Sequence, residues 1–381
     1  MRELAQLSRS ERRALTALLT AAVARVGRDD LATDLDRLVA DAPVDALPEA
    51  AYLHRVSGVV ATSLQATTTL PDDVRNELEI EREDSGLHHL MIVGTLKTIA
   101  DAFNDRGLRW LVMKGPVLAS RLYDQPGDRT YGDIDFLVHP EDYGPAIEIL
   151  EGFGYRHTIR DWVRAKSVMA GQINLAGALL EIDLHWHLHY SNLDRRPFRL
   201  DPIAILERSV EVDVGGVTAP VLDPVDRILM LTFHAARSGG HRLVWLKDIE
   251  RALTIEQPDL AEVVARAEAM ALAPLVGMIL DRAKRVLDAP VDDATLAALL
   301  PSGLRVAERA ALRLSGPAQM HDNDTPIRFL SRSARPTLLA ALTDVPMRGV
   351  RTLTVRGHTF GNETDDPAEK AAYLAAVAAQ R

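Results

Sequence analysis

The chain has 381 residues, of which 47% are hydrophobic and 26% are charged, a composition typical of a globular protein with two or three domains. Its net charge of −10 argues against broad non-specific binding of nucleic acid, which needs a basic surface. Because it contains no cysteine, disulfides and thiolate zinc sites are excluded. The N-terminus has scattered charges instead of a signal peptide, and no run of about 20 apolar residues predicts a membrane span. We therefore expect a cytoplasmic protein.

Residues 1–95 have a spacing of Leu, Val and Ala that predicts a helical region without a catalytic motif. We expect one helix to begin at a cap on Ser10 and to end at Gly27, and a charged helix to begin after Pro71. We interpret three histidines as ordinary residues on the surface or on helix faces: His54, His88 and His89.

A segment of mixed strands and helices follows over residues 96–221. A helix over about 87–105 leads into a short apolar strand that runs into Lys114 and Gly115. Gly115 allows the backbone to approach a ligand closely, and the helix that follows begins with free N–H groups that favour an anion. Lys114 would add a positive charge for the phosphates of a triphosphate. The alternative is that Lys114 only extends from the end of a strand toward solvent.

The next predicted strand begins at Asp133 and carries two acids on one face. Asp133 and Asp135 are about 7 Å apart at Cα, so that their oxygens can converge on divalent cations. Like charges disfavour joint ionisation, and we therefore expect an Asn at either position to leave the metal-free protein as stable or slightly more stable. The other face of the strand is apolar and can enter a core: Ile134, Phe136 and Val138.

Arg129 lies four residues before this strand in a polar turn that contains glycine. We interpret its guanidinium as a second phosphate ligand, with pairing to Asp128 or Asp133 as the alternative. The order of strand, helix, strand, helix and hairpin predicts an α/β arrangement for this segment, not a doubly wound dinucleotide fold. Neither of the common Gly-rich phosphate loops occurs in the chain.

A further strand is predicted over residues 179–190, where apolar and ionisable residues alternate without a break. Gly177 is the expected left-handed residue of a hairpin with the preceding segment. If this strand pairs beside the Asp133 strand, Asp183 becomes the third carboxylate of a divalent-metal site. One face carries only ionisable residues: Glu181, Asp183, His185, His187 and His189. The three histidines also resemble the strand-borne ligands of a zinc hydrolase. Residues four positions apart on a strand, however, lie about 13 Å from each other, which is too far to share one ion easily.

Residues 222–320 predict a C-terminal helical bundle, which begins at Asp223 and Pro224 after a hairpin that turns at Gly215 and Gly216. Residues 321–381 predict a polar tail that finishes in a helix. Four polar residues of the bundle are secondary site candidates, with solvated or salt-bridged helix positions as the alternative: His234, Arg242, Lys247 and Asp248.

Four pieces of sequence carry a resemblance to a known family: Lys114-Gly115, Arg129, Asp133-Ile134-Asp135 and Asp183-Leu184-His185-Trp186. In order and spacing, over about residues 96–250, they resemble an uncharacterised family of bacterial nucleotidyltransferases within the polymerase-beta-like superfamily. The resemblance implies an α+β fold, in which helical regions at both ends flank a small mixed-sheet nucleotidyltransferase core and the C-terminal bundle faces the site. Lys114-Gly115 stands where the superfamily usually has a Gly-Ser pair.

The resemblance implies transfer of a nucleoside monophosphate from a nucleoside triphosphate, ATP or another, to an unidentified acceptor. Mg²⁺ or Mn²⁺ would be held by Asp133, Asp135 and Asp183, and Asp183 would help to remove the proton of the acceptor hydroxyl. The candidate nucleotide-binding residues are Lys114, Gly115, Arg129 and His185. A small molecule, a protein side chain or an RNA end would all suit as acceptor. The alternatives are an inactive nucleotide- or partner-binding protein of this fold and a zinc hydrolase.

Overall fold

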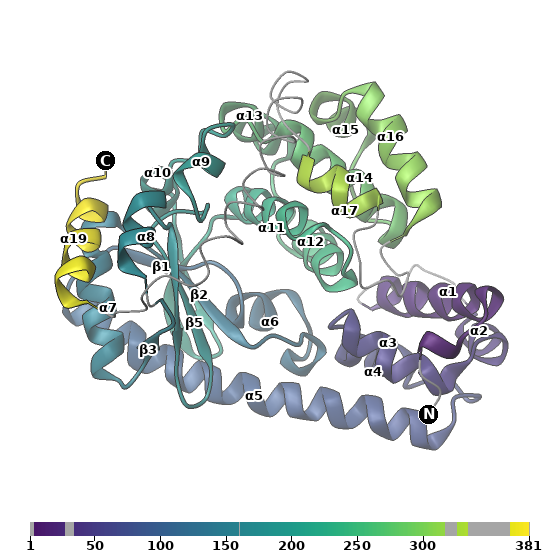
Figure 1. The fold of residues 1–381 in the computed structure, drawn as a ribbon. Coiled ribbons are helices and arrows are strands. Elements are labelled where there is room, and N and C mark those ends of the chain that lie inside the picture. The colour runs from purple at the N-terminus through teal and green to yellow at the C-terminus, as the bar shows by residue number, and fades with distance from the viewer. Residues whose placement is uncertain (1–3, 27–33, 160, 317–325, 334–365, 381) are drawn as a thin grey trace.

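A computed structural model describes residues 4–26, 34–159, 161–316, 326–333 and 366–380. A seven-stranded sheet that mixes parallel and antiparallel neighbours lies in the core of the molecule. Helices from the start of the chain gather at one end of the molecule, and a C-terminal helical bundle lies above the sheet in the view of Figure 1. The predicted α+β fold, with helical regions that flank a mixed sheet, is confirmed.

The order of the strands in the sheet is β3-β4-β5-β2-β1-β7-β6. Their bounds are β1 Trp110–Val112, β2 Asp133–Val138, β3 Arg156–His157, β4 Gln172–Ala176, β5 Glu181–His185, β6 Val210–Val214 and β7 Val217–Val221. Strands β2 and β5 run parallel, with Asp133 opposite Glu181 and Asp135 opposite Asp183. The predicted pairing of the two acid-bearing strands is therefore confirmed.

The two faces of the sheet enter two different hydrophobic cores. Ile134 and Phe136 of β2 belong to a core that includes residues of helices α5 and α7. Leu137 of β2 and Leu111 of β1 belong to the other core, together with the C-terminal bundle and the N-terminal helices. Because side chains alternate along a strand, the acids of β2 share the face of Leu137. They are thereby directed toward the bundle.

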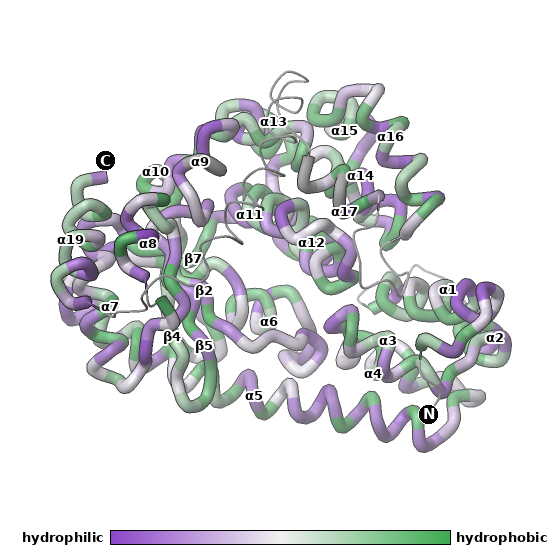
Figure 2. Tube along the Cα trace, viewed as in Figure 1, coloured by the Kyte–Doolittle hydropathy of each residue, from purple (hydrophilic) through white to green (hydrophobic). Residues whose placement is uncertain are grey.

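The helices of the first part of the chain are α1 Arg9–Arg25, α2 Leu35–Asp41, α3 Leu47–Leu53, α4 Ser57–Leu64 and α5 Asp72–Asp105. Helix α1 is capped by Ser8, which forms a capping box with Glu11, so the expected cap at Ser10 is wrong. The two helices predicted on either side of residue 86 form one helix, α5, of 34 residues. It extends from the N-terminal helices to the sheet, and much of its middle is hydrophilic in Figure 2.

Two of the three histidines in this region are buried, which corrects their interpretation as ordinary residues on the surface or on helix faces: both take part in contacts between distant parts of the chain. His54 Nδ1 accepts a hydrogen bond of 3.3 Å from the backbone N–H of Leu243, and only 4% of its surface is exposed. His89 Nδ1 lies 2.7 Å from the hydroxyl of Tyr131. Both therefore join parts of the chain that are distant in sequence.

The helices of the core are α6 Pro116–Leu122, α7 Tyr143–Gly152, α8 Trp162–Val168, α9 Asn192–Arg195 and α10 Pro202–Glu207. Single 3-10 turns occur at Leu4–Gln6, Val44–Ala46, Pro126–Asp128 and Pro140–Asp142. The predicted turn at Gly215 and Gly216 is confirmed, since both have positive φ. Gly177 does not have positive φ, so the expected left-handed turn residue is wrong. A Cβ there would lie 2.3 Å from the ring of Tyr155, which explains the glycine by close packing.

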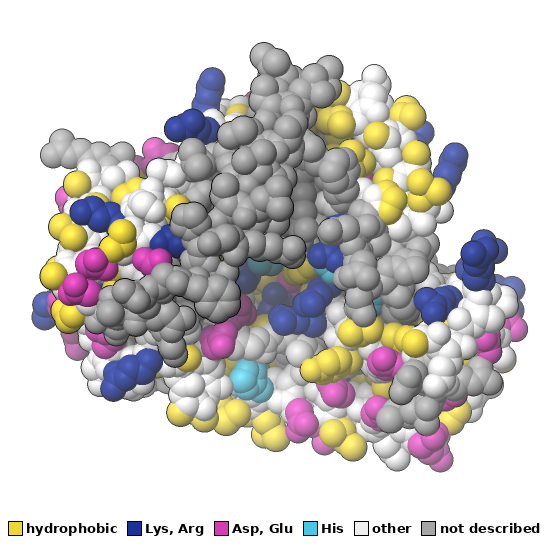
Figure 3. Space-filling model, viewed as in Figure 1, with side chains coloured by type: hydrophobic (Ala, Val, Ile, Leu, Met, Phe, Trp, Pro, Cys, Tyr) yellow, Lys and Arg dark blue, Asp and Glu magenta, His cyan; other side chains and the backbone are white. Residues whose placement is uncertain are grey.

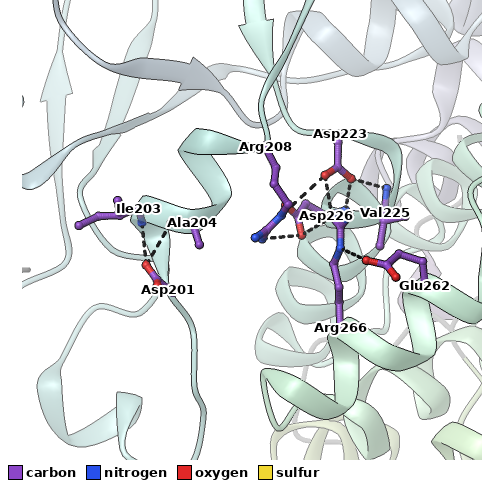
Figure 4. Close-up of polar contacts among 9 residues, drawn as sticks. All are labelled: Asp201, Ile203, Ala204, Arg208, Asp223, Val225, Asp226, Glu262 and Arg266. Atoms are coloured by element: carbon purple, nitrogen blue, oxygen red, sulfur yellow. Dashed lines mark hydrogen bonds and ion pairs between the residues drawn. The ribbon is translucent and has the colours of Figure 1, made fainter.

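The C-terminal bundle comprises α11 Pro224–Ser238, α12 Leu243–Ile255, α13 Leu260–Ala269, α14 Ala273–Leu287, α15 Asp293–Leu299, α16 Ser302–Leu314 and α17 Pro326–Ser333. Asp223 caps α11 as predicted and accepts hydrogen bonds from the N–H groups of Val225 and Asp226. Figure 4 shows that Arg208, which follows α10, and Arg266 of α13 form ion pairs with Asp226 and Asp223 and so join two segments to the start of α11.

The last helix, α19 Pro367–Ala378, confirms the helix predicted near the end of the chain. It packs against α7 and α8, at the end of the molecule opposite the N-terminal helices (Figure 1). The rest of the predicted polar tail lies mostly outside the described residues. In the part of the chain that the structure describes, no helix is long and apolar enough to cross a membrane.

Candidate active site

Asp133 and Asp135 lie on the bundle-facing side of β2, as the alternation predicted. Asp135 is buried, with only 2% of its side chain exposed, whereas 31% of the Asp133 side chain is exposed. The parallel register places Asp183 of β5 directly beside Asp135. Two neighbouring strands thus bring three carboxylates together at one face of the sheet.

Lys114 supplies the positive charge that this group of acids needs. Its ammonium lies 2.9 Å from Asp135 Oδ2 and 3.7 Å from Asp133 Oδ2, because β1 pairs antiparallel with β2 and ends beside the acids. Burial alone would raise the pKa of Asp135, but Lys114 and His185 hold that pKa well below its ordinary value. Although burial acts to lower the pKa of Lys114, the charges of Asp135 and Asp133 raise it. Lys114 does not simply extend into solvent.

Asp183 has the opposite electrostatic behaviour. Burial, and then the negative charge of Asp135, raise its pKa to about 6. The side-chain amide of Asn174, on the neighbouring strand β4, donates a hydrogen bond to Asp183 Oδ1. Alternation in the segment 172–176 could have identified Asn174, because it separates the apolar Ile173 and Leu175. A carboxyl group with a pKa near neutrality can exchange a proton at physiological pH.

The strand that carries Asp183 ends at His185, so the strand predicted to continue to residue 190 is wrong in its second half. The N–H groups of Trp186 and His187 both donate to the carbonyl of Gly171, at 2.9 and 3.0 Å, which bends the chain away from regular pairing. His187 Nδ1 then accepts from the backbone N–H of His189. His187 and His189 therefore do not continue the row of site residues along a strand.

Gly115 has a φ of 74° and precedes the short helix α6. A Cβ at this position would lie 2.6 Å from the backbone oxygen of Asp133, closer than any side chain can approach. Glycine is therefore required here by the packing of the loop on the start of β2.

Arg129 is buried and forms a bidentate ion pair with Asp248 of α12. Its Nε and Nη2 donate to the two carboxylate oxygens at 2.8 and 2.9 Å, and the hydroxyl of Tyr123 donates to Asp248 at 2.8 Å. This partner differs from Asp128 and Asp133, the two that the sequence suggested. Arg129 Nη1 also lies 3.5 Å from the carbonyl of Gly115, so its charge is placed directly behind the Lys114-Gly115 loop.

A cavity of about 230 Å³ opens beside these residues and is bounded by Lys114, Asp135 and His185 on the sheet side. Its opposite wall is α11, which contributes Met230, Leu231, Phe233, His234 and Arg237. Burial, and then the charge of Lys114, lower the pKa of His234 to about 3, so its ring is neutral. His234, a secondary candidate from the sequence, thus belongs to the wall that faces the acids.

The side chains fit a divalent cation. Ligand atoms of Asp135, Asp183 and His185 lie within 4.8 Å of one another. The His185 ring is buried and neither nitrogen makes a hydrogen bond within the described structure, although Nε2 lies 3.4 Å from Asp135 Oδ1. Carboxylate oxygens together with an imidazole nitrogen are ligands that divalent cations accept in proteins. His187 and His189 are not part of this group, so the three histidines do not assemble as zinc ligands here.

Comparison with known proteins agrees with this geometry. A model of a family described as "uncharacterised nucleotidyltransferase" matches residues 41–288, a range that contains all seven strands and helices α11 and α12. A search of curated proteins gave no match.

Proposed function

The chain belongs to this family of nucleotidyltransferases, and from that premise we propose that it moves a nucleoside monophosphate from a nucleoside triphosphate to an acceptor hydroxyl with the help of Mg²⁺ or Mn²⁺. The observation that carries the proposal is the register of β2 and β5, which sets Asp183 beside Asp135 with Lys114 against the acids. Three carboxylates of this kind are costly to assemble unless cations neutralise them.

In this proposal Asp133, Asp135 and Asp183 hold the divalent cations, and His185 orients a carboxylate or contacts the nucleotide. When bound, the cations would stabilise the negative charge that develops on the attacking and leaving oxygens. A bond forms between the acceptor oxygen and the α-phosphorus, the bond from that phosphorus to the bridging oxygen breaks, and pyrophosphate leaves. Asp183, which lies directly beside Asp135, accepts the proton of the acceptor.

Lys114 has two successive roles in the proposal. In the metal-free protein it compensates the acids, as its 2.9 Å contact with Asp135 indicates. Once cations neutralise the acids, its ammonium is free to turn toward the phosphates of the donor. Gly115 keeps the loop close to β2, and the charge of Arg129 behind that loop adds to the attraction for phosphate, reduced by its pairing with Asp248.

The proposal is tested by measuring pyrophosphate release from each of the four nucleoside triphosphates with Mg²⁺, and by mass spectrometry of candidate acceptors. We expect Asp135→Asn to lower the rate by at least about a hundredfold, because it removes a metal ligand. Asp101→Asn is the matched control, since Asp101 is exposed and its ion pair is with Lys97, on the same helix α5. Near-normal turnover in Asp135→Asn would contradict the metal assignment.

The same measurements separate the alternatives. An inactive nucleotide-binding protein would bind triphosphate and release no pyrophosphate. A zinc hydrolase would lose activity on chelation, recover it with Zn²⁺ and not with Mg²⁺, and depend on His185 or His187 more than on Asp183. We expect the reverse order, in which Asp183 is required and the loss of His187 or His189 costs little, because neither His187 nor His189 belongs to the group of possible ligands around Asp135.

A further inference from the structure

The cavity beside the acids is larger than the candidate metal site. Lys114, Asp135 and His185 line one end of it, and its other walls come from the segments after β5 and β7 and from α11. On the face shown in Figure 3, hydrophobic side chains lie beside acidic, basic and histidine side chains in a central hollow. The chemistry proposed above uses only the end with the acids, so the remaining walls have no assigned ligand.

These remaining walls are mostly apolar, with side chains from Met113, Leu188, Leu222, Met230, Leu231 and Phe233. The volume of about 230 Å³ exceeds the roughly 150 Å³ that holds a benzene ring, so a ring with substituents has room. A nucleic-acid strand needs cations along its phosphates. Among the residues that line the cavity, the cations are Lys114, which is paired with Asp135, and Arg237. The walls therefore favour an uncharged ligand.

Uncharged polar side chains interrupt the apolar walls at three places: Gln172 of β4, Tyr190 after β5, and His234 of α11. None of the three side chains makes a hydrogen bond to another described residue, and the lowered pKa of His234 keeps its ring neutral. The ring of His185 is more than nine-tenths buried and also makes no hydrogen bond within the described structure. An apolar cavity with a few polar groups of this kind is typical of a site for a small molecule, which supplies the missing hydrogen bonds.

The register of the sheet places Gln172 on the side of the site where the acceptor reacts. Asn174 of β4 lies opposite Asp183, and Gln172 lies opposite His185. Gln172 and His185 are therefore on the same face of the sheet as that first pair and about 7 Å farther along the strands. In the proposed function Asp183 takes the proton of the acceptor, whereas Lys114 and the donor phosphates lie on the other side, against β1. An acceptor with its hydroxyl at Asp183 thus extends over His185 to Gln172.

The polar groups lie on opposite walls, because Gln172 belongs to the sheet and His234 belongs to α11. A ligand that bonds to both needs polar atoms on more than one side of an apolar body. A small cyclic molecule with two or more hydroxyl groups meets this requirement. A serine or tyrosine side chain of a protein does not, since it has one hydroxyl group at its tip.

We propose that the acceptor is a small molecule with a hydroxyl group on an uncharged, largely apolar ring, that this cavity holds it, and that Gln172 helps to determine which molecule is accepted. The acceptor role rests on the proposed function. The binding of such a molecule to the cavity does not, since it needs neither a metal ion nor turnover. The competing occupant is the nucleobase of the donor.

The binding test is a ¹⁹F NMR titration of 3-fluoro-4-hydroxybenzyl alcohol into the full chain in EDTA, since this probe is one ring with a hydroxyl group at each end. We expect saturable binding to the wild type and binding to Gln172→Ala that is weaker by about three- to tenfold, the loss of one neutral hydrogen bond. Leu188→Trp should abolish binding, because Leu188 lines the cavity, is half-buried, and gives way to a side chain that fills the space.

Two controls isolate the hydrogen bond. Gln65→Ala removes an exposed glutamine outside the cavity and should leave the affinity unchanged. The second probe, 4-fluorotoluene, has no hydroxyl group and should bind the wild type and Gln172→Ala equally. Circular dichroism checks that each variant is folded, and Gln172→Ala carries the test if Leu188→Trp does not fold. The cavity assignment is overturned if the dihydroxy probe fails to bind the wild type, or binds wild type and Gln172→Ala equally.

A competition experiment identifies the occupant. With Mg²⁺ and saturating non-hydrolysable analogues of the four nucleoside triphosphates, we expect the probe to bind with unchanged affinity. Displacement of the probe would assign the cavity to the donor nucleobase and overturn the acceptor assignment.

A transfer experiment tests the class of acceptor directly. Nucleoside triphosphates labelled at the α-phosphorus are incubated with the protein, Mg²⁺ and a cell extract separated into RNA, protein and dialysable small molecules. We expect label in the small-molecule fraction. Label on RNA or on protein would overturn the proposal and leave the proposed function intact. Label in no fraction would contradict the proposed function and the acceptor role together, while the titration in EDTA still decides whether the cavity binds a small molecule.

Discussion

At the level of single residues, the site is a balance between three carboxylates and one ammonium. The 2.9 Å contact of Lys114 with Asp135 Oδ2 is shorter than its 3.7 Å contact with Asp133, and Asp135 is the more deeply buried of the two acids. The ionised form of Asp135 is therefore stabilised in the fold, as its lowered pKa indicates. Asp183 has a pKa raised to about 6, so that it can bind a proton, and protonation relieves the remaining repulsion between the carboxylates.

This balance reverses one expectation from the sequence, namely that an Asn in place of either acid would leave the metal-free protein as stable or more stable. We now expect Asp135→Asn to lower the free energy of unfolding by about 1–3 kcal/mol in EDTA, because Lys114 loses its closer partner. Asp133→Asn should cost less. Urea unfolding of both variants measures the two effects.

The pH dependence of the Asp135→Asn effect has a definite sign. A carboxyl group with a lowered pKa contributes stability above its unfolded pKa of about 4, and that contribution is lost as the pH falls through the folded pKa. The difference between the wild type and Asp135→Asn should therefore be present at pH 7 and shrink in the acid range below about pH 4. A variant that is more stable than the wild type at pH 7 would show that repulsion between the acids dominates.

At the level of elements, α12 holds the core and the N-terminal helices together. The carboxylate of Asp248 accepts hydrogen bonds from the side chains of Arg129 and Tyr123, which lie between α6 and β2. Lys247 is fully buried, contacts Glu250 at 2.8 Å and donates to the carbonyl of Val26 beyond α1. The secondary candidates Lys247 and Asp248 are thus salt-bridged helix residues, which was the alternative that the sequence left open.

We expect Asp248→Ala to lower the free energy of unfolding by about 3–5 kcal/mol, because it leaves the buried Arg129 without a counter-charge. The matched control is the double variant Arg129→Met with Asp248→Leu, which removes both charges and should recover a large part of the loss. Denaturant titration of the three proteins measures the difference. A single variant that costs less than about 1 kcal/mol would show that the ion pair does not hold α12 to the core.

The contact between α3–α4 and α12 depends on a neutral histidine. Burial, and then the charges of His241 and Arg242, lower the pKa of His54 to about 4. Protonation turns Nδ1 from the acceptor for Leu243 N–H into a donor. Stability from neutral His54 is complete above about pH 6.5 and is lost as the pH falls toward its folded pKa, on the order of 2 kcal/mol by pH 5.

His54→Gln tests this dependence, because glutamine keeps an acceptor that does not titrate. We expect the stability of the wild type to exceed that of the variant at pH 7.5 by more than it does at pH 5, as measured by urea unfolding at both pH values. His88→Gln serves as the control for loss of a histidine. A gap between wild type and His54→Gln that is the same at both pH values would mean that the pKa of His54 is the same in the folded and the unfolded protein.

Local patterns in the sequence predicted those elements whose boundaries are set locally. The alternation of apolar and acidic residues around Asp135 predicted β2 and its two faces, and the Asp223-Pro224 pair predicted the start of α11. The end of β5 was not predicted, because it depends on a residue outside the strand. The carbonyl of Gly171 accepts hydrogen bonds from the two N–H groups that follow His185. The pairing of Arg129 was missed for the same reason, since Asp248 is 119 positions away.

At the level of the whole molecule, the helix near the end of the chain supports the wall of the active site. Tyr373 of α19 donates to the carbonyl of Ala170 at 2.6 Å, and Trp186 Nε1 lies 3.3 Å from the Tyr373 hydroxyl. Trp186 directly follows His185, the site histidine at the end of β5. Lys370 adds an ion pair of 2.6 Å with Glu151. Residues near 370 therefore help to fix side chains near 185.

We expect Tyr373→Ala to lower the free energy of unfolding by about 3–5 kcal/mol, since it removes a fully buried aromatic ring. Tyr373→Phe keeps the ring and should cost about 1 kcal/mol, the value of the lost hydrogen bond. If α19 also fixes His185, hydrogen exchange of the Trp186 indole N–H should be faster in Tyr373→Ala and the rate of pyrophosphate release should fall. Loss of stability without faster exchange at Trp186 would confine α19 to a structural role remote from the site.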